Sequence, residues 1–196
     1  MPTSHHNMST PTKISAPSKI LCIGDSLIAG FPYDVDESWV AECGRMTGIE
    51  MINRGICGEC CADIVDRLKG QLVATHARHV LLEGGMNDIL DYVPMDATMD
   101  ELRRAITISH DNGAKIAIVM PWRVAAYELN DKIDELRECM TRELIGTPLI
   151  DMEPCLPPLG DRNNCFVWDG VHPTDATYKL IGNYATKIIT KETLIN

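Results

Sequence analysis

The sequence is short of positive charge and has no long hydrophobic run. Its 18 Lys and Arg residues against 28 Asp and Glu give a formal net charge of -10. Affinity for nucleic-acid phosphates comes mainly from clustered Lys and Arg, so this balance argues against a nucleic-acid-binding protein and against docking to anionic membranes. No stretch approaches the roughly 18 consecutive apolar residues that would cross a bilayer. Membrane insertion is therefore not expected.

A secretory signal is also missing at the amino terminus. Residues 1–17 (MPTSHHNMSTPTKISAP) are polar and interrupted by proline, without the apolar core of about 7–15 residues that such a signal needs. We interpret them as a disordered lead-in and expect a cytoplasmic protein. The 196 residues, 45% hydrophobic and 23% charged, fit one soluble domain over residues 18–196.

The eight cysteines lack the pairing of a zinc site. Three stand together in CGECC, at Cys57, Cys60 and Cys61, but no second close pair of Cys or His follows. We therefore expect reduced thiols without a metal. A redox or metal role for this cluster is the alternative. Cys22, inside an apolar run, is expected to pack as a small hydrophobic residue.

Apolar runs alternate with amphipathic stretches from residue 18 onward. Five short, nearly continuous apolar runs are typical of buried parallel strands: 19–24, 49–53, 79–84, 115–120 and 148–152. Helical spacing of apolar residues follows each run, over residues 37–47, 60–72, about 99–106, 133–144 and 175–190. The pattern predicts a single three-layer α/β/α domain around a five-stranded parallel sheet.

Polar residues gather after the predicted strands. In such a sheet, ligands bind at the carboxyl ends of the strands, so residues far apart in sequence meet at one edge. The residues expected there are Asp25 and Ser26, Asn53 and Gly55, Gly85, Asn87 and Asp88, Pro121, Trp122 and Arg123, and the segment WDGVHPT at 168–174.

The segment DGVH places Asp169 three residues before His172. At this spacing a carboxylate can reach one nitrogen of the imidazole and fix its tautomer, leaving the other nitrogen to face Ser26 as its base. An exposed turn is the simpler interpretation of this motif taken alone. Beside it, the backbone N–H groups of Ser26 and Gly55 and the side-chain amide of Asn87 could converge as donors to an oxyanion. Ordinary glycine-asparagine turns are the alternative for those residues.

Together these blocks resemble the GDSL or SGNH hydrolase family. GDSL itself stands at Gly24–Leu27, the second block's glycine is assigned to Gly55, G-x-N-D stands at Gly85–Asp88, and D-x-x-H at Asp169–His172. No G-x-S-x-G is present, which separates the chain from the larger α/β-hydrolases. The resemblance implies a flavodoxin-like sheet of strand order 2-1-3-4-5.

The resemblance also implies a chemistry. Ser26 would be the nucleophile, His172 its base and Asp169 the residue that orients the base, with Ser26, Gly55 and Asn87 as oxyanion donors. The expected reaction is hydrolysis of a small-molecule carboxylic ester, with a short or medium acyl chain or a sugar acetate, through an acyl-enzyme. It needs no metal or other cofactor. Lysophospholipids and thioesters remain open, and the oligomeric state cannot be read from these residues.

Four aromatic residues near the strand ends are candidates for lining a substrate pocket: Phe31, Tyr92, Trp122 and Trp168. Other classes of function also stay open. A flavodoxin-like nucleotide or flavin binder would place phosphate after the first strand, but Asp25 there is unfavourable for it. A catalytically idle ligand-binding protein on the same fold is a further alternative.

Overall fold

The computed structural model describes residues 19–192, and these contain one parallel sheet of five strands. The strands are β1 (Lys19–Gly24), β2 (Glu50–Gly55), β3 (His79–Glu83), β4 (Lys115–Val119) and β5 (Leu149–Ile150), and their order is β2-β1-β3-β4-β5. The expected fold class and strand order are both confirmed. The expected lead-in, residues 1–17, lies outside the described residues.

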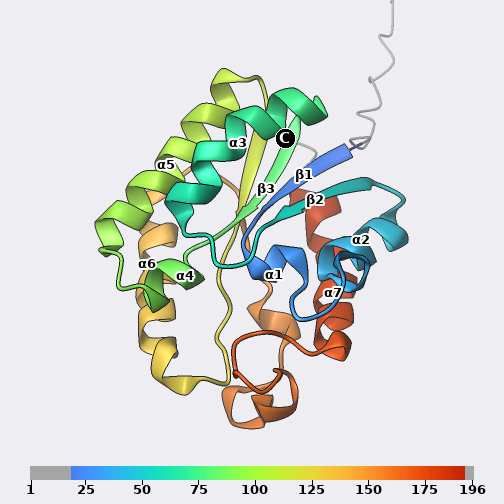
Figure 1. Ribbon diagram of the computed structural model, residues 1–196, viewed down its shortest axis with the longest axis vertical. Helices are drawn as coiled ribbons and strands as arrows, with labels where there is room; N and C mark the ends of the chain where they lie inside the picture. The colour runs from blue at the N-terminus through green and yellow to red at the C-terminus, as the bar shows by residue number, and fades with distance from the viewer. Residues whose placement is uncertain (1–18, 193–196) are drawn as a thin grey trace, which may run out of the picture.

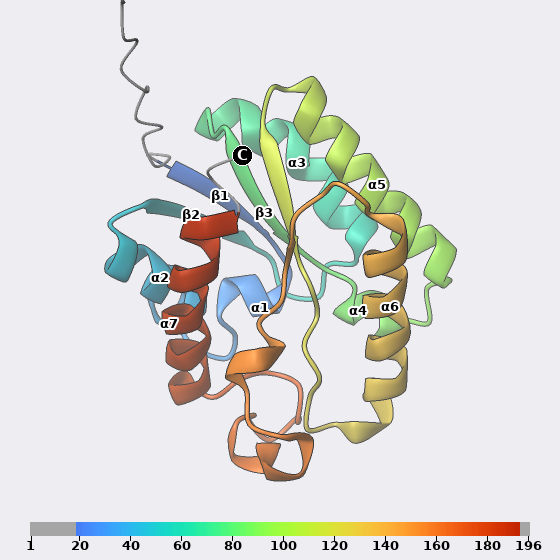
Figure 2. The ribbon, with the colours of Figure 1, turned by 180° about the vertical axis from the view of Figure 1, so that it is seen from behind.

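Helices cover both faces of the sheet. Helices α2 (Trp39–Thr47) and α7 (Asp175–Glu192) lie together on one side of the strands, and α3 (Cys61–Thr75) and α5 (Met95–Asp111) on the other (Figures 1 and 2). Helix α6 (Asn130–Glu143) joins β4 to β5, and two short helices, α1 (Ser26–Ala29) and α4 (Met86–Leu90), follow β1 and β3. No helix among the described residues is long and apolar enough to span a bilayer.

The two cores explain why the strands are nearly all apolar. Neighbouring residues of β1 point to opposite faces, so Ile20 and Cys22 pack with α2 and α7 whereas Leu21 and Ile23 pack with α3 and α5. Strand β2 differs from expectation, because it is an edge strand and none of its residues is fully buried. No other strand of the described residues pairs with its outer edge.

Short helices missed by the sequence analysis matter most for the site. Asp25 caps the amino terminus of α1, where its Oδ1 accepts the Leu27 N–H at 2.8 Å. Gly30, with a φ of 95°, ends the helix after a single turn. The hydroxyl of Ser26 therefore stands at the first position of a helix directly above the carboxyl end of β1.

Gly55 lets β2 approach this helix closely. A Cβ on Gly55 would lie 2.2 Å from the Ala29 nitrogen and 2.7 Å from the Asp25 carbonyl oxygen, both of them backbone atoms that cannot rotate away. The position therefore requires glycine for steric reasons alone.

We predict that Gly55→Ala lowers the free energy of unfolding by about 1–3 kcal/mol or more, as measured by urea denaturation, because the backbone must move apart. The matched control is Gly70→Ala on α3, where a Cβ meets nothing within 4 Å. That change should stabilise the protein by roughly 0.5–1 kcal/mol. Equal effects of the two changes would contradict the steric account.

Candidate active site

The structure brings Ser26, His172 and Asp169 together at the carboxyl edge of the sheet. Ser26 Oγ lies 2.8 Å from His172 Nε2, and His172 Nδ1 lies 2.6 Å from Asp169 Oδ2. The imidazole thus bridges a hydroxyl and a carboxylate that are distant in sequence. Because Asp169 accepts the Nδ1 proton, the nitrogen that faces Ser26 is free to accept a proton in turn.

The Asp169 carboxylate is held by its own turn. Its Oδ1 accepts the Val171 and His172 N–H groups at 2.8 and 2.9 Å, and Gly170 between them has a φ of 72°. Partial burial raises the pKa of Asp169, but the hydrogen bonds from His172 and Val171 outweigh it and hold the pKa below its usual range. The carboxylate is therefore charged beside the imidazole at neutral pH.

The loop after β4 is hydrogen-bonded to this turn. The N–H groups of Ala125 and Ala126 both donate to the Gly170 carbonyl oxygen, at 2.9 and 3.0 Å. A Cβ on Gly170 would come within 3.0 Å of the Ala126 nitrogen, so the two segments are in direct contact. The position of the imidazole is thereby tied to the path of residues 121–126.

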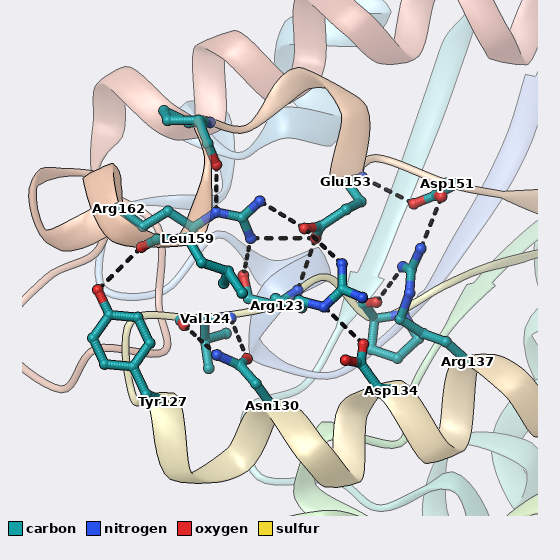
Figure 3. A network of polar contacts seen from close by, with 12 residues as sticks. Arg123, Val124, Tyr127, Asn130, Asp134, Arg137, Asp151, Glu153, Leu159 and Arg162 are labelled. Carbon is teal, nitrogen blue, oxygen red and sulfur yellow. Dashed lines mark hydrogen bonds and ion pairs between the residues drawn. The ribbon is translucent and has the colours of Figure 1, made fainter.

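A buried ion network fixes that path (Figure 3). Arg162, whose side chain is only 3% exposed, pairs with Glu153 at 2.6 Å and donates to the Arg123 carbonyl oxygen at 2.7 Å. Glu153 also accepts the Arg123 N–H at 2.9 Å, and Arg123 Nε reaches Asp134 on α6 at 2.8 Å. Burial raises the pKa of Glu153, but the bonds from Arg162 and Arg123 lower it by more. The pKa therefore lies below its usual value, and the carboxylate stays charged. The network joins the segment before Asp169 to the loop after β4.

The three predicted oxyanion donors differ in whether their N–H groups already have an acceptor. The N–H of Ser26 has no acceptor among the described residues. The Gly55 N–H, in contrast, already donates to Asn53 Oδ1 at 2.9 Å, so it would have to leave this acceptor to bind an oxyanion. Asn87 Nδ2 donates to the Glu59 carbonyl oxygen at 2.9 Å and to Asp25 Oδ2 at 3.1 Å. Its amide is held beside the loop that follows β2.

Gly58, which the sequence analysis did not single out, carries another backbone N–H in the loop after β2. It sits in a turn closed by the Glu59 N–H to the Ile56 carbonyl, with a φ of 83°, and its own N–H has no acceptor among residues 19–192. The next residue, Glu59, is the one whose carbonyl accepts from Asn87. Arg67 fastens the turn by pairing with Glu59 at 2.6 Å and donating to the Gly24 carbonyl oxygen at 3.0 Å. The two glycines of NRGICG look equivalent in the sequence. In the fold, the Gly55 N–H has an acceptor and the Gly58 N–H has none among the described residues.

The four aromatic residues predicted to line a pocket lie in different surroundings. Phe31 contacts the His172 ring edge-on, with centroids 4.7 Å apart, and Trp168 is 88% exposed beside Asp169. Tyr92 lines a groove of about 540 Å³ next to α4, together with apolar residues such as Ile89, Val93 and Leu129. Trp122 was expected to line a pocket, and this is wrong, because it is fully buried in the core shared with α2 and α7. An apolar residue after a strand can as well turn inward as face the cleft.

The cysteines of CGECC point in different directions. Cys61 is buried, Cys60 Sγ lies 3.6 Å from Asp91 Oδ2, and Cys57 is exposed. Burial and nearby carboxylates raise the pKa of Cys60 to about 12, which disfavours the reactive thiolate. Within residues 19–192, no three His, Cys, Asp or Glu side chains are grouped so that they could hold a metal ion.

Comparison with known proteins identifies the family of the chain. The model of the GDSL-like lipase/acylhydrolase family matches residues 22–180. The chain belongs to this family. An arylesterase of Vibrio mimicus is 31% identical over 112 residues, and the match spans about half of each protein, 53% of this chain and 54% of the arylesterase.

Solved structures share the fold of this GDSL-family chain. A putative lipolytic protein of the G-D-S-L family from Desulfitobacterium hafniense superimposes with a TM-score of 0.80 at 22% identity, over 87% of this chain and 98% of its own. The psychrotrophic esterase EstA of Pseudoalteromonas sp., in a structure inhibited by monoethylphosphonate, gives 0.75 at 22% identity, over 89% and 97%. At these identities the likeness establishes the fold alone.

We predict that Arg162→Met costs about 3–5 kcal/mol of unfolding free energy, measured in urea, because it leaves Glu153 buried with one cation fewer. The control is Arg103→Met on α5, an exposed arginine that also meets two carboxylates, those of Asp100 and Glu143. That change should cost less than about 1 kcal/mol, since exposed ion pairs contribute little. A small cost at Arg162 would contradict a structural role for the network.

Proposed function

We propose that this GDSL-family hydrolase is a serine esterase that cleaves small carboxylic esters through an acyl-enzyme. The observation that carries the proposal is the chain of hydrogen bonds from Ser26 Oγ to His172 Nε2 and from His172 Nδ1 to Asp169. The same juxtaposition argues against the idle-protein and flavin-binder alternatives, which have no use for a charged carboxylate aligned behind an imidazole and a hydroxyl.

In the proposed first step, Ser26 Oγ attacks the ester carbonyl carbon while His172 Nε2 takes the hydroxyl proton. Asp169 stabilises the imidazolium that results. The tetrahedral intermediate collapses as His172 returns the proton to the departing alkoxide, which leaves as an alcohol. Water then attacks the acyl-Ser26 by the same route, and the carboxylic acid and the free hydroxyl are restored.

The oxyanion of each intermediate would be held by the Ser26 N–H, the Gly58 N–H and the Asn87 amide. The first two have no competing acceptor among the described residues, so they are available without breaking a bond. Asn87 Nδ2 is held in position by Asp25 and Glu59, and one of its N–H groups would be shared between its present acceptor and the oxyanion. Donors of this kind act by being in place before the charge develops.

The groove beside α4 suits the acyl chain. It is mainly apolar, and its wall includes Ile89 and Leu90, two and three residues after Asn87 on the same short helix. Its volume of about 540 Å³ lies within the usual range for small-ligand sites, roughly 300–1,000 Å³. Short or medium acyl esters, including sugar acetates, are the substrates we propose. All eight cysteines are free, which suits the reducing cytoplasm as the place where the enzyme acts.

We predict that Ser26→Ala abolishes hydrolysis of a p-nitrophenyl acyl ester, while circular dichroism and the urea midpoint stay close to those of the wild type. Ser109→Ala is the control. Its hydroxyl is also buried but has no hydrogen-bond partner in the described part of the chain, and its loss should leave turnover unchanged. Wild-type turnover in Ser26→Ala would refute the nucleophile assignment. A panel of esters that varies acyl length, with sugar acetates and thioesters, would then define the substrate.

A second prediction separates Gly58 from an ordinary turn glycine. Gly58→Ala should lower kcat by on the order of 10²-fold with little change in KM, because strain at a φ of 83° displaces one oxyanion donor. Gly48→Ala is matched to it, since Gly48 also has a positive φ, 69°, and open space around a Cβ. Both variants should lose about 1–2 kcal/mol of stability, but only Gly58→Ala should lose turnover. Equal kcat values would remove Gly58 from the mechanism.

A further inference from the structure

Two carboxyl groups are fully buried beneath the candidate site. Asp25 follows β1, Glu83 ends β3, and each is 0% exposed. The two strands are neighbours in the sheet, and Gly24 passes closely over the Glu83 side chain, where a Cβ on Gly24 would lie 3.2 Å from Glu83 Oε2. Nothing in the proposed acyl transfer uses either carboxyl as an acid or a base.

Asp25 connects two parts of the site. Its Oδ1 accepts the Leu27 N–H in the first turn of α1, next to Ser26, and its Oδ2 accepts from Asn87 Nδ2 at 3.1 Å. One carboxylate thereby holds the helix turn that carries the nucleophile and the amide proposed for the oxyanion. Both bonds need Asp25 as an acceptor.

Glu83 has no comparable partners. No N–H or O–H group among the described residues donates to either of its side-chain oxygens in hydrogen-bond geometry. Asp25 directly follows Gly24, whose Cβ position lies 3.2 Å from Glu83 Oε2, and the charge of Asp25 raises the pKa of Glu83. Two buried carboxylates side by side would repel each other, so one of them must keep a proton. Asp25 already accepts two N–H donors, which leaves Glu83 as the protonated member.

The pKa values agree with this assignment. Burial first, and then the charges of Asp25 and Asp88, raise the pKa of Glu83 well above its ordinary value, and the nearby Asp25 N–H opposes this only partly. Burial also raises the pKa of Asp25, to about 6, but the bonds from Leu27 and Glu83 lower it against that trend.

Among residues 19–192, no Lys or Arg forms an ion pair with Asp25 or Glu83 to replace the proton. The titratable groups that interact electrostatically with the pair are Asp88 on α4, Cys61 on α3, Tyr178 on α7 and Cys57 in the loop after β2, none of which is a cation. Arg67 reaches the Gly24 carbonyl nearby, but its ion pair is with Glu59. The imidazole of His172 lowers the pKa of Asp25 by its charge only when it is protonated.

We propose that Glu83 is a positioning residue for the acyl transfer: its protonated carboxyl donates a hydrogen bond to Asp25 and so fixes the carboxylate that holds Asn87 and the first turn of α1. This role rests on the proposed function, since it concerns the donors of that reaction. Glu83 itself touches neither the substrate nor the reacting atoms.

Two substitutions of Glu83 test the role. Glu83→Gln keeps a donor toward Asp25 and should retain kcat within about threefold. Glu83→Leu removes the donor and should lower kcat by about tenfold to a hundredfold at nearly constant KM, because the oxyanion donors lose their alignment. Equal kcat values for Glu83→Leu and the wild type, or an equal loss in both variants, would overturn the proposal.

Stability against pH gives a readout that does not need Glu83→Leu to fold. Because the folded-state pKa of Glu83 lies above its unfolded value near 4.5, its contribution to stability is present below that value and is lost as the pH rises through the folded-state pKa. Glu83→Gln removes this titration, so its unfolding free energy should fall less steeply than that of the wild type between about pH 5 and pH 8. Parallel curves would contradict a protonated Glu83.

Two spectroscopic measurements distinguish a failure here from a failure of the proposed function. The infrared carbonyl band of a protonated, buried carboxylic acid should be present in the wild type at neutral pH and absent in Glu83→Gln. The side-chain amide resonances of Asn87 should keep their wild-type positions in Glu83→Gln. Absence of the band from the wild type, or displaced Asn87 resonances in Glu83→Gln, would overturn the inference even if the enzyme is active. A wild type without esterase activity would instead refute the proposed function, while the band and the resonances would still decide the placement of the proton.

Discussion

The contact between the Ser26 hydroxyl and the His172 imidazole is the interaction on which the rest of the site depends. It joins residues 146 positions apart in the sequence. Parallel strands make this possible, because every strand delivers its last residue to the same edge of the sheet. The hydroxyl is fixed by Asp25 at the start of α1, and the imidazole by the turn at Asp169. Each half is held by its own local hydrogen bonds, and the packing of the domain sets the 2.8 Å separation between them.

The carboxylates around this contact each accept hydrogen bonds from particular donors. Asp169 stays ionised behind the imidazole because backbone N–H groups and the ring itself donate to it. Asp25, next to Ser26 in the chain, accepts the Leu27 N–H and the Asn87 side-chain amide. The Arg162–Glu153 pair sits farther out and holds the loops instead of the reacting groups. Carboxylates near the nucleophile are thus each matched to a definite set of donors, which limits the cost of burying them.

Much of the architecture could be predicted from the sequence because strand and helix periods alternate so regularly. The same regularity placed Ser26, Asn87, Asp169 and His172 at one edge. Local details could not be predicted where the sequence does not show the surroundings of a residue. Gly55 and Gly58 look alike in the sequence, but in the fold the Asn53 side chain accepts the N–H of Gly55. Trp122 follows a strand just as a pocket residue would, yet its indole fills the core. Glu83 ended an apolar run without any pattern to show that it would be buried against Asp25.

The central claim is that the Ser26 hydroxyl is activated by His172 and reacts covalently with a carbonyl-like centre. The most direct test is labelling with a p-nitrophenyl phosphonate, followed by mass spectrometry of the digested protein. The account predicts a single phosphonyl group on the peptide that carries Ser26, formed rapidly in the wild type and very slowly when His172 is replaced by Ala. Labelling only at other residues, or equal rates with and without His172, would contradict it.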